Sequence, residues 1–214
     1  RKDVNIMMVN KGELYIPADY RMNKTEATAL IQHEVGTHVL TYYNGTRQPL
    51  ELLSSGLADY DPLQEGLAVM SEFLVDGLTG NRLRTLAGRV IAGSALMEGA
   101  EFPQLFRLLK MDYGFTAERA FNITSRIMQG GGFLKDIIYL KGLVQLRDHL
   151  QNGGEYEPLL AGKFGLKHTK IIEELTERKV LKTSALRPSY LLTENVTNKL
   201  NIIREGLPLS QMIT

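Results

Sequence analysis

Two of the four histidines in this 214-residue chain lie close together in the segment 33–38, HEVGTH. Zinc prefers imidazole ligands, and a glutamate beside such a ligand can accept a proton from water that the metal polarises. The segment has the form H-E-x-x-x-H, one residue longer than the H-E-x-x-H of zinc peptidases. It therefore predicts a hydrolytic metal site with His33 and His38 as ligands and Glu34 as general base.

The longer spacing requires a helix that is locally wider than an α-helix. At about 100° per residue, side chains five residues apart on an α-helix point about 140° away from each other. A single π-type turn brings residues five apart onto one face, and such turns are frequent at functional sites. Gly36 makes the wider turn easier to form,. We therefore expect a π-type distortion between the two histidines.

A catalytic zinc ion needs a third protein ligand, and Glu65 is the best candidate. It lies in the segment 64–68, QEGLA, on the next predicted helix, where small residues allow close approach to another helix. Asp59 and Asp61 are alternatives, as ligands or as acceptors for a histidine N–H; Glu51 and Glu72 are further alternative ligands. Without a metal, the same pattern would be two histidines on an ordinary amphipathic helix.

Three motifs resemble those of one metallopeptidase family: HEVGTH at 33–38, NGTRQPL at 44–50 and QEGLA at 64–68. The family comprises the microtubule-associated tyrosine carboxypeptidases of animals and bacterial relatives known as flavohemoglobin expression-modulating QEGLA motif proteins. Gln64 is typical of the bacterial branch. The segments 131–136 (GGFLKD) and 139–142 (YLKG) also look like family blocks, so the resemblance runs from about residue 30 to 145, and more weakly to near 205.

The resemblance implies a zincin-like fold, in which a short sheet lies over an active-site helix and a helical lower half follows. It implies that His33, His38 and Glu65 hold one zinc ion per chain, and that Glu34 is the general base for zinc-activated water. The implied activity is a carboxypeptidase that removes C-terminal residues, aromatic ones among them, from a peptide or protein tail. The α-tubulin tail cleaved by the animal members is not transferred to a bacterial-looking chain.

Two other functions use the same residues. A zinc endopeptidase or amidase would need the same three ligands, and a regulatory binding protein would keep the metal site as a structural or vestigial feature. The sequence gives no indication of the natural substrate or the oligomeric state.

Hydrolysis also benefits from a second donor to the oxyanion. Tyr139 is our candidate because it follows the glycine-rich segment at 130–132 on a predicted helix. Tyr42 and Tyr43 are the alternatives, and a packing role for Tyr139 is an equally good interpretation.

Carboxypeptidase action needs a cation that holds the terminal carboxylate. Arg126, Lys135 and Arg47 lie in or beside the recognisable blocks, although each residue type is more often a surface charge or part of a structural ion pair. The backbone amides of Gly131 and Gly132 could approach a peptide or an anion.

These residues need a scaffold, which the sequence pattern predicts to be a mainly helical α+β fold. Two apolar runs, 4–9 and 14–17, flank a glycine-containing turn and predict a β-hairpin,. A helix capped by Asn23 or Thr25 is expected to end near Gly45, and another to run from Pro62 to about Val75. Residues 46–62 should form a connection. Further helices are expected over about 81–98, 101–111, 116–128, 133–151 and 191–204.

Composition excludes several classes of protein. Lys and Arg number 25 against 24 Asp and Glu, so the net charge of +1 gives no basis for nucleic-acid binding,. The absence of cysteine excludes disulfides, iron–sulfur clusters and thiol nucleophiles,. No apolar run reaches the roughly 20 residues of a membrane span. We therefore expect a single cytoplasmic metallopeptidase-like domain over residues 1–214, lacking part of its N-terminal region.

Overall fold

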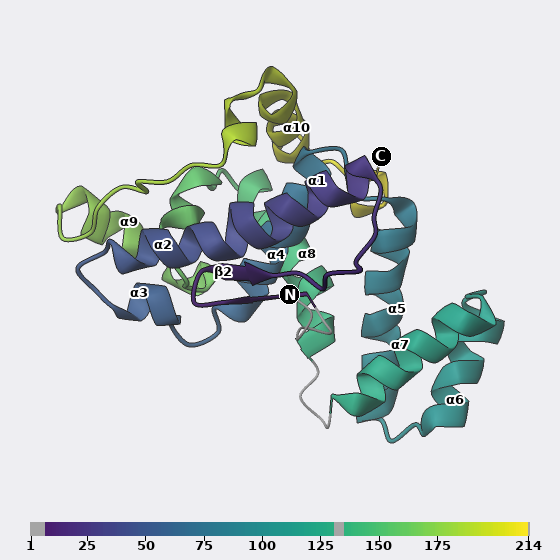
Figure 1. Ribbon diagram of the computed structural model, residues 1–214. Helices are drawn as coiled ribbons and strands as arrows, with labels where there is room; N and C mark the ends of the chain where they lie inside the picture. The colour runs from purple at the N-terminus through teal and green to yellow at the C-terminus, as the bar shows by residue number, and fades with distance from the viewer. Residues whose placement is uncertain (1–6, 131–134, 214) are drawn as a thin grey trace. The chain divides into compact units, whose positions relative to one another are not determined.

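The computed structural model describes residues 7–130 and 135–213, which form many helices and one two-stranded sheet (Figure 1). The predicted mainly helical α+β class is confirmed. The chain divides into two compact units. Unit 1 comprises Arg1–Leu78 and Gly142–Thr214, and unit 2 comprises Thr79–Lys141. That all 214 residues form one catalytic domain stays a prediction.

The predicted β-hairpin is confirmed, with shorter strands than the apolar runs suggested. Strands β1 (Met8–Asn10) and β2 (Glu13–Tyr15) pair antiparallel, with Val9 opposite Leu14. Residues 4–6 of the first run lie outside the described residues.

The two-residue turn of the hairpin has the backbone conformation that favours glycine. Lys11 and Gly12 both have positive φ angles, 47° and 80°, as in the primed turns that match the twist of paired strands,. A Cβ atom at Gly12 would lie 2.8 Å from ring atoms of Tyr42 and of Tyr43. The hairpin turn is therefore packed directly on these two tyrosines.

The helix that carries the histidines is capped by Asn23, one of the two predicted caps, which forms a capping box with Glu26. The N–H of Glu26 donates to Asn23 Oδ1 (2.9 Å), and the N–H of Asn23 donates to the Glu26 carboxylate (3.0 Å),. From this cap three helical segments follow without a break: α1 (Lys24–His33), the π-helical η1 (Glu34–Val39) and α2 (Leu40–Thr46). They form one rod, which runs beside the hairpin in Figure 1. We call this continuous segment the rod.

Helix α4 (Asp61–Leu74) is the centre of unit 1, and it begins one residue before Pro62, near the predicted start. Its buried apolar residues lie on all sides of the helix, which is the pattern of a helix surrounded by others. It contacts α1 and η1 of the rod and α10 (Glu194–Arg204). The fully or nearly fully buried apolar side chains of α4 are Leu63, Leu67, Ala68, Val69, Met70, Phe73 and Leu74.

Helix α8 (Ile138–Gln151) crosses α4 at backbone contact distance. A Cβ atom at Gly66 would lie 2.5 Å from the backbone of Gly142, and one at Gly142 would overlap the carbonyl oxygen of Pro62. Gly66 is the small residue that follows Glu65, so the expected close helix approach after this glutamate is confirmed.

The rest of unit 1 is a series of short helices between residues 46 and 61 and after α8. Buried amides tie the end of the rod to this C-terminal region. The Asn44 side chain donates to the carbonyls of Leu160 (2.9 Å) and Leu186 (3.0 Å) and accepts from the Leu186 N–H (2.9 Å). The short helices are α3 (Leu52–Ser55), η4 (Glu157–Ala161), η5 (Leu166–His168), α9 (Thr169–Glu177), η6 (Ser189–Leu192) and η7 (Leu209–Gln211).

Unit 2 contains α5 (Gly80–Met97), α6 (Phe102–Arg107), the π-helical η2 (Leu108–Asp112), α7 (Ala117–Gln129) and the 3₁₀ turn η3 (Lys135–Ile137). Its core joins α5, η2 and α7 through Ala92, Leu109, Phe115, Ala120, Ile123 and Ile127. The helices expected over 81–98, 101–111 and 116–128 are thus confirmed, the second with a π-helical end. The helix expected from residue 133 begins at Ile138, and residues 133 and 134 lie outside the described part of the chain.

Across residues 7–130 and 135–213, no helix combines the length and the apolar character that crossing a bilayer requires.

Replacing Gly142 by alanine tests the close crossing of α8 and α4. In a free helix this change is stabilising by up to about 1 kcal/mol, because glycine loses more backbone entropy on folding. Here the new Cβ would overlap Pro62, so we expect Gly142→Ala to lower the free energy of unfolding by about 1–3 kcal/mol,. Chemical denaturation measures it. Gln145→Ala, at an exposed position of α8, is the control and should stay within about 0.5 kcal/mol of the wild type,.

A buried tyrosine pair predicts a loss of stability at high pH. The hydroxyls of Tyr156 and Tyr190 lie 3.1 Å apart, and burial raises the pKa of Tyr190 to about 12 and that of Tyr156 well above its usual range. The unfolded chain releases these protons near pH 10 but the folded one retains them. The contribution of the pair is therefore fully present below pH 10 and lost as pH rises toward 12. We expect the thermal midpoint to fall over this interval, and to fall less in the Tyr156→Phe, Tyr190→Phe double variant.

Candidate metal centre

The structure brings His33, His38 and Glu65 together in unit 1. One donor atom from each side chain lies within 4.8 Å of the other two, a grouping that could hold a metal ion. Glu65 Oε2 is 3.8 Å from His33 Nε2 and 3.7 Å from His38 Nε2. Both histidines come from the rod and the glutamate from α4. We call these three residues the trio.

The rod presents both histidines to α4 because it widens between them. Residues Glu34–Val39 form a π-helix, as the five-residue spacing predicted. The hydroxyl of the fully buried Thr37 donates to the carbonyl of Gln32, five residues earlier (3.0 Å). The wider turn brings the two imidazoles to a ring-centroid distance of 5.3 Å, so the π-helix converts an unfavourable spacing into a shared face,.

Glu72 contacts the ring nitrogen of His33 that does not face Glu65. Its Oε1 atom lies 2.8 Å from His33 Nδ1, and both residues are buried, at 5% and 6% exposure. A carboxylate on one ring nitrogen fixes the tautomer and the ring orientation, and leaves the other nitrogen as a ligand atom. From the sequence, Glu72 is only an alternative ligand. Its position seven residues after Glu65, two turns along the same helix face, was the available signal for a supporting role.

His38 is surrounded by acceptors from both helices. Burial by itself lowers the pKa of His38, but the hydrogen bond and charge of Glu65 and the charge of Glu34 outweigh it, so its pKa is raised. Gln64 adds a smaller contribution in the same direction and accepts a hydrogen bond from the Thr41 hydroxyl (2.8 Å). A metal must displace the proton of His38 to bind, which makes binding weaker at lower pH.

The donor set of the trio fits zinc. Two imidazole nitrogens and one carboxylate oxygen are ligands of catalytic zinc sites. Two donors that each lie about 2.1 Å from one ion cannot be more than about 4.2 Å apart. The two measured distances to Glu65 Oε2, 3.8 and 3.7 Å, satisfy this limit. Glu34 is beside the trio, with Oε1 4.0 Å from His33 Nε2.

The other alternative ligands do not belong to the trio. Asp59 forms an ion pair with Lys167, and Glu51 is exposed. Asp61 lies on α4 one turn before Glu65. Arg47, a predicted carboxylate-binding residue, is exposed at the end of α2, nine residues after His38. Its role stays a prediction.

The remaining predicted residues belong to unit 2, and their roles also stay predictions. Arg126 Nε lies 2.6 Å from Asp136 Oδ1, so this arginine has a structural ion pair, and Arg89 joins it at 3.2 Å. Lys135 is exposed in η3. Tyr139 lies beneath the Arg89 guanidinium, 5.9 Å from the ring centroid. Gly131 and Gly132 lie outside the described residues.

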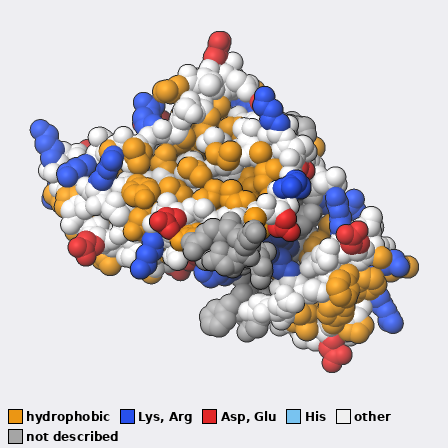
Figure 2. Space-filling view, viewed as in Figure 1, with side chains coloured by type: hydrophobic (Ala, Val, Ile, Leu, Met, Phe, Trp, Pro, Cys, Tyr) orange, Lys and Arg blue, Asp and Glu red, His pale blue; other side chains and the backbone are white. Residues whose placement is uncertain are grey.

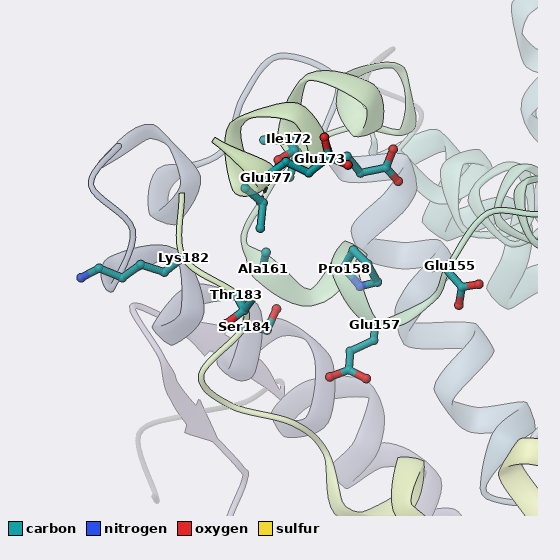
Figure 3. Close-up of a pocket in the computed structure, with 11 residues that line it drawn as sticks. Glu155, Glu157, Pro158, Ala161, Ile172, Glu173, Glu177, Lys182, Thr183 and Ser184 are labelled. Atoms are coloured by element: carbon teal, nitrogen blue, oxygen red, sulfur yellow. Dashed lines mark hydrogen bonds between the residues drawn. The ribbon is translucent and has the colours of Figure 1, made fainter. Parts of the chain in front are cut away.

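The rod also exposes hydrophobic side chains. Figure 2 shows such side chains gathered over α1 and α2. Along the rod, Ile31, Val35 and Tyr43 are exposed by 49%, 38% and 43%. A cavity of about 500 Å³ lies elsewhere in unit 1, between η4, α9 and residues 182–184 (Figure 3). None of the predicted site residues is among those that line this cavity.

Comparison with known proteins identifies the family of the chain. A sequence model of the family described as "Microtubule-associated tyrosine carboxypeptidase" matches residues 3–207. The mouse and human proteins named microtubule-associated tyrosine carboxypeptidase 1 are each 32% identical to the chain, over 133 and 135 residues. The matched regions cover 56% and 57% of this chain and 27% of each relative, so the chain spans about a quarter of their length. Because the family match covers nearly all of the sequence, the chain belongs to the microtubule-associated tyrosine carboxypeptidase family.

Proposed function

We propose that this chain is a zinc-dependent carboxypeptidase, which hydrolyses the last peptide bond of a peptide or protein tail. The observation that carries the proposal is the trio of His33, His38 and Glu65, with Glu34 4.0 Å from a ligand nitrogen. The family membership supports peptide-bond hydrolysis at a C-terminus. Since the two relatives are named tyrosine carboxypeptidases, a peptide that ends in tyrosine is the first substrate to test.

Each residue near the trio has a distinct part in this reaction. A bound zinc ion would supply Lewis acidity and lower the pKa of water. Glu34, partly buried, accepts the proton of the attacking water and returns it to the leaving amine,. Glu72 keeps the His33 ring in its orientation,. Gln64, on α4, forms a side-chain hydrogen bond with His38 that contributes to its raised pKa.

Tyr139 and its alternative Tyr42 are the residues to compare as oxyanion donors. Tyr42 lies four residues after His38, and its ring packs beneath the hairpin turn. Tyr139 lies on α8, with the Arg89 guanidinium 5.9 Å from its ring centroid. Tyr42→Phe and Tyr139→Phe, compared for kcat at saturating substrate, decide between the two residues. The variant that loses kcat with an unchanged KM identifies the donor.

Replacing Glu34 by glutamine separates metal binding from proton transfer. We expect Glu34→Gln to retain about one zinc ion per chain, because the trio is intact, and to lower kcat by about 10²- to 10⁴-fold. Zinc is measured by mass spectrometry and turnover by release of the terminal amino acid. Glu51→Gln, at an exposed position, is the matched control and should resemble the wild type. Wild-type turnover by Glu34→Gln would contradict the proposal, and no zinc in any preparation would favour a binding protein.

Substitutions of Glu65 and Glu72 test the two proposed roles of carboxylates, as a metal ligand and as the partner of a ligand histidine. We expect Glu65→Ala to abolish stoichiometric zinc binding, since it removes one of three ligands. Glu72→Gln should weaken zinc binding by about 10- to 100-fold while retaining the site, as for other partners of ligand histidines. Competition with a chromogenic chelator measures both affinities. Equal affinities of Glu72→Gln and the wild type would show that Glu72 does not support His33 as a ligand.

A further inference from the structure

Lys163 is a cation of unit 1 to which nothing above gives a role. It follows η4, and its backbone is fixed beside α3. Its N–H donates to the Leu53 carbonyl (2.8 Å), and its own carbonyl accepts from the Leu57 N–H (3.0 Å). A lysine whose backbone is held on both sides presents its side chain from a defined position.

Two aromatic rings hold the ammonium group of Lys163. Nζ lies 5.6 Å from the ring centroid of Tyr42 and 5.8 Å from that of Tyr60, within the range of cation–π attraction,. Burial lowers the pKa of Lys163, and the charge of Asp61 offsets this only in part. The partly buried ammonium would therefore gain from a further negative charge.

The alignment of the rod with α4 places two neighbours of this lysine one helical turn from the trio. The rod and α4 run antiparallel, because residues further along the rod contact earlier residues of α4. The contacts pair His33 with Glu72, His38 with Glu65, and Thr41 with Gln64. The next turn of the rod after His38 is Tyr42, and the turn of α4 before Glu65 is Asp61. Four residues of helix advance about 6 Å. Tyr42 and Asp61, the neighbours of Lys163 on the two helices, thus each lie one turn beyond the trio.

A carboxypeptidase needs a cation close to the bond that it cleaves. The scissile carbonyl carbon and the terminal carboxylate carbon are one residue apart, about 3.5 Å along an extended chain. A charge-assisted hydrogen bond from the carboxylate to an ammonium adds about 2.8 Å. The Lys163 ammonium is a candidate for this cation because it contacts the ring of Tyr42, whose backbone lies one turn of the rod after His38.

We propose that Lys163, held between Tyr42 and Tyr60, binds the α-carboxylate of the substrate and sets the enzyme to remove a single C-terminal residue. The proposal rests on the proposed function. The carboxylate-binding role thus goes to Lys163, which the sequence did not single out, and not to Arg126, Lys135 or Arg47.

The test compares an acetylated Ala-Ala-Ala-Tyr peptide with its C-terminal amide. The zinc-loaded wild type should cleave the free acid with a kcat/KM about 10- to 100-fold higher than the amide, the range expected for one hydrogen bond to a charged group. Lys163→Met keeps the apolar stem between the rings and removes the charge. It should lose the preference for the acid through a raised KM, while Lys163→Arg should retain part of it.

Lys167→Ala is the matched control, because Lys167 is an exposed cation four residues away that pairs with Asp59. It should keep the wild-type preference for the acid. Zinc content and thermal midpoint are measured for each variant. If the wild type cleaves the acid and the amide equally well, the proposal is overturned without any variant. It is also overturned if Lys163→Met keeps the wild-type preference for the acid.

Failure of the proposed function gives a different result, since no peptide is then cleaved by the zinc-loaded wild type. Binding of the two peptides, measured by calorimetry, still decides the role of Lys163. Tighter binding of the acid by the wild type but not by Lys163→Met supports carboxylate recognition. Equal binding of both peptides by the wild type overturns it.

Discussion

The five-residue separation of His33 and His38 is the constraint on which the candidate site depends. A regular α-helix would turn one imidazole away from α4, and the trio would have only two members. The π-helix over Glu34–Val39 removes this mismatch within one turn. Because a π-turn is less favourable than an α-turn, it needs tertiary support. The support comes from regular helices at both ends of the segment and from Glu72, which holds the His33 ring on the α4 side.

The rod can face α4 in this way only if α4 is fixed in position. Helix α4 is buried along most of its length, so its polar residues are individually placed: Glu65 and Gln64 face the rod, and Glu72 pairs with His33. An unpaired buried carboxylate is costly, which makes the Glu72–His33 contact part of the fold as well as of the site. Gly66 and Gly142 let α8 approach α4 to backbone contact, which fixes the distance between these two helices.

Local signals in the sequence predicted the parts of the site that neighbouring residues determine. Short-range geometry determines the cap at Asn23, the hairpin turn at Lys11 and Gly12, the start of α4 near Pro62 and the π-turn. The supporting role of Glu72 required the register between two helices 39 residues apart in the chain, which no local pattern contains. Lys163 was missed for the same reason, since it meets Tyr42 across more than a hundred residues. The division of the chain at Thr79 and Lys141 also had no Ser- or Pro-rich linker to reveal it.

One antiparallel helix pair carries both the trio and two neighbours of Lys163. Tyr42 lies four positions after His38 on the rod, and Asp61 lies four positions before Glu65 on α4, so the spacing of these residues from the trio is set by the rise of a helix,. Such a spacing is more rigid than one set by a loop, because it changes only if a whole turn is inserted or the two helices slide.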